Sequence, residues 1–393
     1  MLRRSLLKGS AAAALGGGAG WYSYDNGVFS VGKGAEFAPW HDWNDPSGSA
    51  SLQLVRAAIL AASPHNTQPW RFHVTPSSIE LYLDATRSVP GLDPYLREAH
   101  LGIGCALENL ALAAAAHGLT PTVTLSDGKL EAPPPGTPLR LIARIDLSPT
   151  QPQSTELYAA IPNRHTNRSI YDPSRELPPA FVTELSRLSG VDTRVRLTVF
   201  LNQADRDQLT RISSSANFDL YSDPHVEAGS EQWIRWHHAD AIAHRDGLTI
   251  DTFGLSPLTT AFAKLAPVSM LRRAAAPSER SKMYATQMES ARLVGIISVQ
   301  DRLDIPQSVL TGRLWQRIHL LAAARGVAAR PCNEAIEMID HERSLNQPAR
   351  RLRELGEVLC DETAQPTFLF LMGYPTLPAH ESPRRPVEAV TIA

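Results

Sequence analysis

The chain of 393 residues is poor in cysteine: it has three, Cys105, Cys332 and Cys360, and no Cys-x-x-Cys pair. An odd number without that spacing argues against a disulfide framework and against a zinc knuckle. Charge of one sign is also lacking, since 38 Lys and Arg stand against 40 Asp and Glu, for a net charge of −2. We therefore expect no nucleic-acid partner.

A metal site and a membrane span lack support as well. His237 and His244 lie two helical turns apart, but the stretch has no pair of ligands at i, i+4, so no metal is predicted. The most apolar stretch near the amino terminus, Gly9 to Gly20, is short and consists mainly of Gly and Ala. Because a stable span needs about 20 strongly apolar residues, we do not expect one here.

That stretch follows Met1-Leu2-Arg3-Arg4-Ser5-Leu6-Leu7-Lys8, and residues 1–30 together resemble a twin-arginine export signal. A disordered basic tail is the alternative reading. Since residues around Ala19-Gly20-Trp21 form no clean small-x-small cleavage site, the signal can also remain uncleaved. We expect a periplasmic or otherwise exported protein with the twin-arginine translocase as a partner.

The composition is otherwise that of a globular protein, with 43% hydrophobic and 20% charged residues. A chain of this length exceeds what one hydrophobic core usually serves, which favours two domains or one intimate double domain. The proline-rich stretch Ala132-Pro133-Pro134-Pro135-Gly136 indicates a link between strands.

The most informative stretch is Ser63-Pro64-His65-Asn66-Thr67-Gln68-Pro69-Trp70-Arg71-Phe72. It follows an amphipathic helix predicted over residues 51–62 and leads into a strand. Its two prolines are expected to hold the backbone extended, so that the amides of Asn66 and Gln68 face the edge of a flat heteroaromatic ring. A capped turn that enters a strand is the alternative.

This stretch resembles the Pro-Ser-Ser-x-Asn-x-Gln-Pro-Trp motif of the nitroreductase superfamily, whose members are FMN-dependent oxidoreductases and normally intertwined homodimers. The His-Asn-Thr-Gln-Pro-Trp-Arg spelling and the chain length resemble one branch, the Acg family of fused double-domain proteins. The resemblance covers residues 50 to 390. It implies an α+β, nitroreductase-like fold that holds FMN noncovalently.

The sequence also matches itself. A helix predicted from Leu101 and ended by Gly118 aligns with a second from Thr311, with Gly104 over Gly312 and Gly118 over Gly326. We interpret this as an internal duplication into two pseudo-equivalent halves, residues 48–150 and 155–390, each with a mainly antiparallel sheet and packed helices. Strands are predicted at 139–147, 293–299 and 367–372. Gly102 to Gly104 follows no strand and lacks a third glycine, which argues against a dinucleotide motif.

The halves carry complementary pieces. Residues 161–171 resemble the superfamily's Arg-x-Ser-x-Arg arm, and the first half has no counterpart. Conversely, the amide-bearing stretch has no counterpart in the second half near residues 189–192. The resemblance therefore implies one complete FMN site between the halves, a second site that is inactive, and a monomer that mimics the family dimer.

The resemblance also assigns residues to that site. Guanidinium groups suit a phosphate, so Arg164 and Thr166 are the phosphate candidates, completed by Arg384 and Arg385. Arg168 is assigned either to the phosphate or to the N1/O2 edge of the flavin. The full predicted set is Ser63, Pro64, His65, Asn66, Gln68, Arg164, His165, Thr166, Arg168, Pro331, Cys332, Asn333, Glu334, Arg384 and Arg385.

Residues 331–334 correspond to a loop that donates a backbone amide to flavin N5, although Asn333-Glu334 replaces the usual acidic residue and glycine. Cys332 is interpreted as a small residue packed on the ring, with a redox thiol as the alternative. No catalytic residue is assigned. Residues 247–285 are predicted to form a lid over the flavin, with four covering side chains. These are Phe253, Leu258, Phe262 and Met270.

The predicted function is that of an FMN-dependent oxidoreductase, which passes a hydride from a small-molecule donor through FMN to an electron-poor acceptor such as a nitroaromatic or a quinone. Because NAD(P)H is scarce outside the cytoplasm, it is an uncertain donor for an exported enzyme. One alternative is a catalytically silent protein that sequesters FMN under its lid. Another is a degenerate binding module without FMN.

Overall fold

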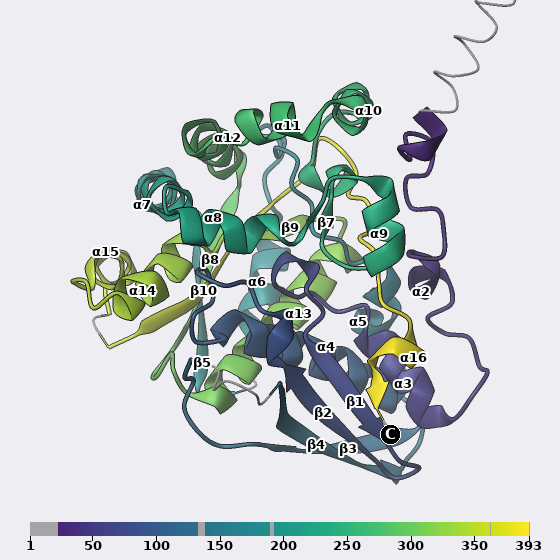
Figure 1. The fold of residues 1–393 in the computed structure, drawn as a ribbon. Coiled ribbons are helices and arrows are strands. Elements are labelled where there is room, and N and C mark those ends of the chain that lie inside the picture. The colour runs from purple at the N-terminus through teal and green to yellow at the C-terminus, as the bar shows by residue number, and fades with distance from the viewer. Residues whose placement is uncertain (1–22, 133–137, 189–191, 362, 393) are drawn as a thin grey trace, which may run out of the picture.

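The structure is a computed structural model that describes residues 23–132, 138–188, 192–361 and 363–392. Two sheets flank a central pair of long helices, α4 (Arg97–Ala116) and α13 (Ile305–Ala324) (Figure 1). Helix α4 packs on strands of the first sheet, α13 packs on the second sheet, and the two helices pack on each other. The core is therefore continuous from one sheet to the other.

The two sheets share one topology. The first contains β1 (Trp70–Val74), β2 (Ser78–Asp84), β3 (Leu119–Leu125), β4 (Leu139–Pro149) and β11 (Thr391–Ile392), in the order β11-β1-β2-β4-β3. The second contains β5 (Val195–Phe200), β8 (Leu293–Val299), β9 (Ala328–Pro331) and β10 (Gln365–Gly373), in the order β5-β8-β10-β9. In each half, two strands precede the long helix and two follow it. Apart from the parallel β1–β11 pair, both sheets are antiparallel, which confirms the α+β prediction.

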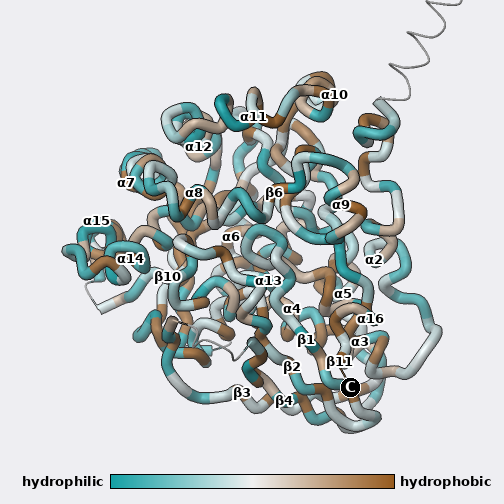
Figure 2. Tube along the Cα trace, viewed as in Figure 1, coloured by the Kyte–Doolittle hydropathy of each residue, from teal (hydrophilic) through white to brown (hydrophobic). Residues whose placement is uncertain are grey.

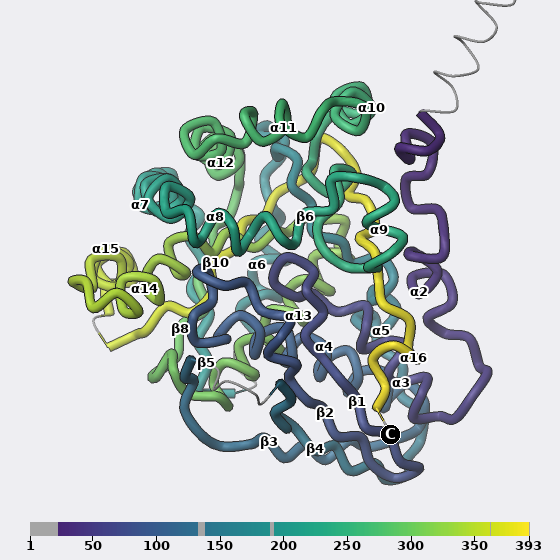
Figure 3. Tube along the Cα trace, in the orientation of Figure 1, coloured from purple at the N-terminus to yellow at the C-terminus, as the bar shows by residue number. Residues whose placement is uncertain are grey.

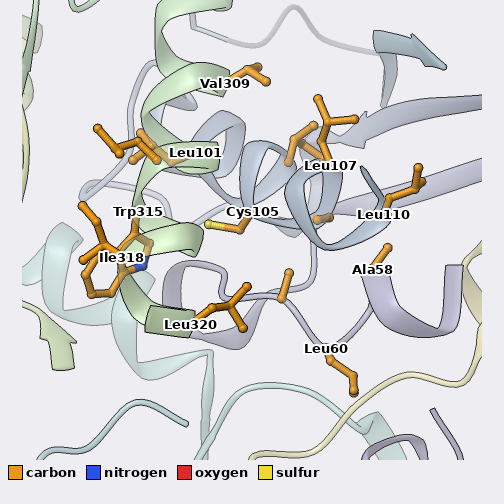
Figure 4. Close-up of a cluster of buried hydrophobic side chains, with 14 of the residues drawn as sticks. Ala58, Leu60, Leu101, Cys105, Leu107, Leu110, Val309, Trp315, Ile318 and Leu320 are labelled. Carbon is orange, nitrogen blue, oxygen red and sulfur yellow. The ribbon is translucent and has the colours of Figure 1, made fainter. Parts of the chain in front are cut away.

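The central helices meet at two glycines. A Cβ atom on Gly104 would lie 2.0 Å from the carbonyl oxygen of Val309, and one on Gly312 would lie 2.0 Å from that of Leu101. Each glycine thus contacts the residue three positions before the other. Only glycine permits this approach, because any side chain would overlap the facing backbone. Figure 4 shows Cys105 pointing from α4 toward α13, where its Sγ lies 3.2 Å from the carbonyl oxygen of Gly312.

Among the described residues, α4 is the one helix long and apolar enough to cross a bilayer. Its most apolar window is 78% buried inside the protein. Burial of that extent is typical of a core helix of a globular protein.

The long connection between β5 and β8 forms most of the upper layer in Figure 1. Its helices are α7 (Gln203–Tyr221), α8 (Pro224–Glu231), α9 (His238–His244), η5 (Ile250–Phe253), α10 (Pro257–Leu265), α11 (Val268–Ala274) and α12 (Pro277–Ser290), and its two short strands, β6 (Ile234–Arg235) and β7 (Leu248–Thr249), pair in parallel. Helices α14 (Glu334–Ser344) and α15 (Arg350–Leu359) pack beside α7. Hydrophobic and hydrophilic residues alternate along α15 (Figure 2), and its Leu355 is buried against the second sheet.

The remaining helices are short. They are α2 (Ala38–His41), α3 (Ala50–Ala58), η1 (Pro64–Asn66), η2 (Ala85–Arg87), α5 (Glu156–Ala159), η3 (Ile161–Asn163), α6 (Pro179–Leu188) and α16 (Val387–Val390). The predicted helix over 51–62 is found as α3, which the Ser49 side chain caps and which ends at Ala58. The predicted strands at 139–147, 293–299 and 367–372 are found within β4, β8 and β10.

The end of the chain, which the sequence assigns to the second half, crosses to the first half. After β10 it runs beside the amino-terminal segment (Figure 3) and ends in β11, which pairs with β1. A hydrogen bond links the two terminal segments: Trp40 Nε1 donates to the Ser382 carbonyl oxygen at 2.8 Å. Three stretches with predictions lie outside the described residues. They are residues 1–22 of the predicted export signal, most of the proline-rich link at 132–136, and residues 189–191.

Candidate functional site

A cavity of about 430 Å³ lies between the halves. Ligand pockets for small molecules commonly have volumes of this order. Its wall combines η1, the amino-terminal part of α4, the arm near residue 164, the loop after β9, helix α12 and the carboxy-terminal segment. Segments from both halves of the sequence therefore meet on one cavity.

Most of the sequence-predicted site residues line this cavity. They are Ser63, Pro64, His65, Asn66, Arg164, Thr166, Arg168, Pro331, Asn333, Glu334 and Arg384. The amide stretch, the arginine arm, the loop after β9 and the carboxy-terminal segment thus come together as the sequence predicts. Four further predicted residues do not line it, namely Gln68, His165, Cys332 and Arg385.

The amide stretch is not extended, and that prediction is wrong. Residues 64–66 form the single turn η1, and His65, Asn66 and Gln68 have φ values of 46°, 55° and 51°. Left-handed backbone is unfavourable for residues other than glycine, so surrounding contacts must hold it. The tight turn directs Asn66 toward the cavity and Gln68 away from it.

The two amides bind protein groups rather than standing free. Asn66 Nδ2 donates to the carbonyl oxygens of Gly247 and Pro383 at 3.0 and 2.9 Å, and its Oδ1 accepts from Arg384. Gln68 Nε2 donates to Arg245 at 2.9 Å, and its Oε1 accepts from the backbone N–H of Arg385. The expectation that both amides face a ring edge is corrected: they fasten the carboxy-terminal segment.

Two buried arginines form one end of the cavity. Arg164 Nη2 donates to the Leu60 carbonyl oxygen at 3.1 Å, and Arg384 Nη2 donates to that of Ala61 at 3.2 Å. Both guanidinium groups lie over the Trp40 ring, at 5.8 and 4.5 Å from its centroid. The Nε atom of each is buried and has no partner among the described residues.

Neither arginine forms a salt bridge with a described residue. Burial lowers the pKa of Arg164 to about 10. Burial and then the charge of Arg164 lower the pKa of Arg384 well below its ordinary value. The carboxylate of Glu381 acts on Arg384 but forms no salt bridge with it. Buried charge without a salt-bridge partner is costly, so this end of the cavity is suited to an anion.

The predicted residues outside the cavity have structural contacts. His165 stacks edge-on against Trp40 at 4.6 Å, and burial lowers its pKa to about 3. Arg385 donates to the carbonyl oxygens of Gln68 and Ala389, which corrects its assignment to a phosphate clamp. Cys332 is buried outside the cavity, so the structure does not place it against a ring as predicted. Burial raises the pKa of its thiol, which argues against a reactive thiolate.

The loop after β9 brings polar groups to the opposite side. Asn333 Nδ2 donates to Glu98 Oε1 at 2.9 Å, while its Oδ1 accepts from the Leu369 backbone at 2.8 Å. Glu334 accepts from Asn217 at 3.3 Å. The Asn333 side chain is thereby fixed against α4.

The cavity is also lined by charged and aromatic residues that the sequence analysis did not identify. They are Glu98, Tyr221, Arg280, Tyr284, Arg330 and Glu337. Arg168 lies among them, donates to the Thr252 carbonyl oxygen at 3.1 Å, and has its pKa lowered to about 10 by burial and then by Arg330. No local pattern marks these residues, because each occupies an ordinary position on a helix or strand.

The segment predicted as a lid, residues 247–285, contributes to the wall of the cavity, but most of the side chains predicted to cover it do not. Residues of η5, α10, α11 and α12 line the cavity, including Phe253 and Leu271. Leu258, Phe262 and Met270 instead point outward, with exposed fractions of 83%, 59% and 48%. The helices cover the cavity with the opposite face from the one expected.

No family model matches the chain. It is 34% identical over 128 residues to a Mycobacterium tuberculosis protein named putative NAD(P)H nitroreductase Rv3131, and 40% identical over 95 residues to the putative NAD(P)H nitroreductase acg of the same species. The chain is therefore similar in sequence to parts of these two proteins. The matches cover 32% and 24% of this chain, and about a third of the length of each named relative, 35% and 27%. A longer match, 26% identical, links 86% of the chain to 91% of the uncharacterized M. tuberculosis protein Rv3127.

Solved structures of nitroreductases are also similar to this chain. An FMN-dependent nitroreductase NfnB from Mycobacterium smegmatis in complex with NADPH aligns with 61% of the chain and 97% of its own, at 16% identity and a TM-score of 0.36. A nitroreductase with bound FMN from Desulfitobacterium hafniense covers 60% of the chain and 95% of its own, at 13% identity and a TM-score of 0.34. At these scores the structural similarity adds nothing to the sequence match.

Proposed function

We propose that the protein is an FMN-dependent oxidoreductase of the nitroreductase type and a member of the Acg family. The observation that carries the proposal is the pair Arg164 and Arg384, two buried guanidinium groups without a carboxylate partner at one end of the cavity. A dianionic phosphate would supply the missing counter-charge and accept from their unpaired Nε–H groups. The arginine pair therefore fits the phosphate of FMN.

The rest of the cavity fits a flat, largely apolar ring. Leu101, Cys105, Trp315 and Phe368 line it together with the small Gly102. Burial keeps His65, one of two histidines that line the cavity, neutral, since its pKa falls to about 3. The cavity's arginines supply fixed positive charge, which suits a phosphate at one end and an electron-rich reduced ring beyond it.

FMN, when bound, supplies hydride transfer between a donor and an electron-poor acceptor. The protein's own residues do the positioning. Arg164 and Arg384 would hold the phosphate, Asn66 orients Arg384, and Arg168 brings a second positive charge to the same cavity. Helices α10 to α12 cover the cavity and would exclude water from it.

We further propose that the chain arose by internal duplication and works as a monomer that mimics a homodimer. The matching strand orders of the two sheets support this, as do α4 and α13, each 20 residues long and joined by reciprocal glycine contacts. The cavity of about 430 Å³ uses the arginine arm of one half and η1 of the other. The pseudo-equivalent second site is proposed to be inactive.

Donor, acceptor and location are also proposed. The names of the relatives favour NAD(P)H as donor, and nitroaromatics or quinones are the proposed acceptors. Residues 1–30 favour export by the twin-arginine translocase, which moves folded proteins, so FMN would be taken up in the cytoplasm. An exported enzyme would then use a donor other than NAD(P)H.

A second candidate function is FMN sequestration. It is favoured by the extent of the lid, because residues from η5 through α12 line the cavity and can block access of a second substrate. Rapid mixing of the flavin-loaded protein with NADPH or with dithionite distinguishes the two functions. After either reductant has bleached the visible flavin band, re-oxidation by a quinone supports the enzyme, and a bleached flavin that a quinone does not re-oxidise supports sequestration.

The decisive experiment is the flavin content of the purified full chain. We expect about one FMN per chain by absorbance, and a large loss in Arg384→Gln. The matched control is Arg353→Gln, which removes an exposed arginine from α15. A colourless protein that stays colourless after addition of FMN would refute the proposal and favour a binding module without flavin.

A further inference from the structure

Two carboxyl groups face each other on the wall of the cavity. Glu98 of α4 and Glu337 of α14 both line it, with exposed fractions of 8% and 6%. The two side chains are close enough for a hydrogen bond between them, and burial raises the pKa of both. Because an ionised carboxylate is only an acceptor, a hydrogen bond between two carboxyl groups requires a proton on one of them.

The neighbouring groups indicate which residue carries the proton. Glu98 Oε1 already accepts from Asn333 at 2.9 Å and lies 3.3 Å from Arg97 Nη2, contacts that favour its ionised form. No described cation forms a salt bridge with Glu337. Burial, followed by the charge of Glu98, raises the pKa of Glu337 well above its ordinary value. Glu337 is therefore the donor and Glu98 the acceptor.

The surrounding charges help to retain this proton. Asp340 engages both nearby cations, Arg97 at 2.7 Å and Arg302 at 2.9 Å, and so takes up much of their charge. Asp93 accepts the backbone N–H groups of Glu98 and Ala99, and burial raises its pKa to about 7. The titratable and charged groups that act on the pair from α4, α14 and their neighbours are Asp93, Arg97, Asp340 and Glu334. Carboxyl groups thus outnumber guanidinium groups in a region of low dielectric.

The pair also lies beside the loop at residues 331–334, which by the family resemblance donates a backbone amide to flavin N5. Asn333, in that loop, donates directly to Glu98. The cavity therefore brings a retained proton close to where an acceptor would receive its electrons.

We infer that the Glu98–Glu337 pair supplies the proton taken up by the acceptor, an inference that rests on the proposed function. A quinone becomes a hydroquinone when it gains one hydride and one proton. The hydride, with both electrons, comes from the reduced flavin. The proton leaves the Glu337 carboxyl group for the acceptor oxygen, and the resulting carboxylate regains a proton from water.

The test compares two acceptors in the flavin-loaded full chain after reduction by dithionite. A quinone needs a proton, whereas ferricyanide accepts single electrons without one. In Glu337→Gln we expect quinone re-oxidation to slow about 100-fold, at the lower end of the usual contribution of a general acid. Ferricyanide re-oxidation should change less than about twofold. Glu337→Asp, which retains a carboxyl group, should recover part of the quinone rate.

Glu289→Gln, which alters an exposed carboxyl group of α12 outside the cavity, is the matched control and should leave both rates unchanged. Equal slowing with both acceptors in Glu337→Gln would indicate a merely structural role and overturn the inference. Unchanged quinone re-oxidation in a variant that binds and reduces FMN normally would overturn it while leaving the proposed function intact.

A second readout needs no flavin and no turnover. At a pH well above the value of about 7 to which the pKa of Asp93 is raised, the infrared spectrum of the full chain should still contain the carbonyl band of a protonated carboxyl group, and Glu337→Gln should lose that band whereas Glu289→Gln keeps it. A wild-type spectrum without the band would overturn the inference. Absence of flavin binding in a protein that shows the band would instead overturn the proposed function.

Discussion

Asn66 and Arg384 are joined by a hydrogen bond of 2.6 Å between Oδ1 and Nη1, although 318 positions separate them in the sequence. The same guanidinium group also donates to Ser382 Oγ at 2.7 Å and to the Ala61 carbonyl oxygen. The amide turn therefore acts on the cavity largely through the arginine that it holds.

This relationship predicts the behaviour of Asn66→Ala. Loss of the amide should release Arg384, so affinity for FMN should fall by about 1.5 to 3 kcal/mol, as for a hydrogen bond to a charged group. Affinity for riboflavin, which lacks the phosphate, should fall much less. Fluorescence titration of the apoprotein with both flavins measures the difference. Equal losses would instead indicate a direct contact between Asn66 and the ring.

Arg164→Ala should also discriminate between the two flavins. Its guanidinium group is buried without a salt bridge, so its removal takes away a phosphate contact but also a destabilising charge. We expect FMN affinity to drop by about 1.5 to 3 kcal/mol while the flavin-free protein keeps or gains thermal stability. Calorimetric titration and thermal unfolding measure the two effects. Riboflavin affinity that falls as far as FMN affinity would contradict the phosphate role.

Gly104→Ala should be strongly destabilising. A methyl group there would lie 2.0 Å from the Val309 carbonyl oxygen, and neither helix can move without repacking both sheets. Overpacking of a core usually costs about 1 to 3 kcal/mol, and we expect a loss at the upper end or beyond. Urea unfolding of the purified variant checks this.

Gly356→Ala is the control for that substitution. Gly356 also lies within a helix, α15, but a Cβ atom there would meet nothing within 4 Å. Because alanine favours helix, stability should rise by about 0.5 to 1 kcal/mol. If Gly104→Ala and Gly356→Ala lost similar amounts of stability, the close contact between α4 and α13 would not be the cause of the destabilisation in Gly104→Ala.

His65 should make stability depend on pH. Burial, then the charges of Arg168 and Arg280, lower its pKa from 6.5 to about 3. A depressed pKa means that the unfolded chain takes up the proton first. The stability present above pH 6.5 is therefore lost as pH falls toward 3. Below about pH 6.5, the wild type should therefore lose unfolding free energy relative to His65→Gln.

The regular elements could be predicted from the sequence because their signals are local. The apolar helices that end near Gly118 and Gly326, and the β-rich runs beside them, depend on spacing and caps within a few residues. The motif resemblance likewise brought η1, the arm at Arg164 and the carboxy-terminal segment to one cavity. The orientation of individual side chains was harder to predict from the sequence.

The misses share a physical cause, which is contact between distant segments. Gln68 turns away from the cavity because its partners, Arg245 and Arg385, come from elsewhere in the chain. Leu258 has the composition of a covering residue but lies on the outer face of α10. The pairing of Glu98 with Glu337 depends on how α14 packs, which no local pattern indicates.

The crossing of the carboxy-terminal segment has a consequence for biosynthesis. Arg384 reaches the cavity only after the chain has passed β10, and β11 then secures this segment by pairing with β1. A nascent chain still attached to the ribosome before this point cannot form the anion end of the cavity. Cofactor loading would therefore follow translation, and a product cut short by even a dozen residues would be released without the means to retain its flavin.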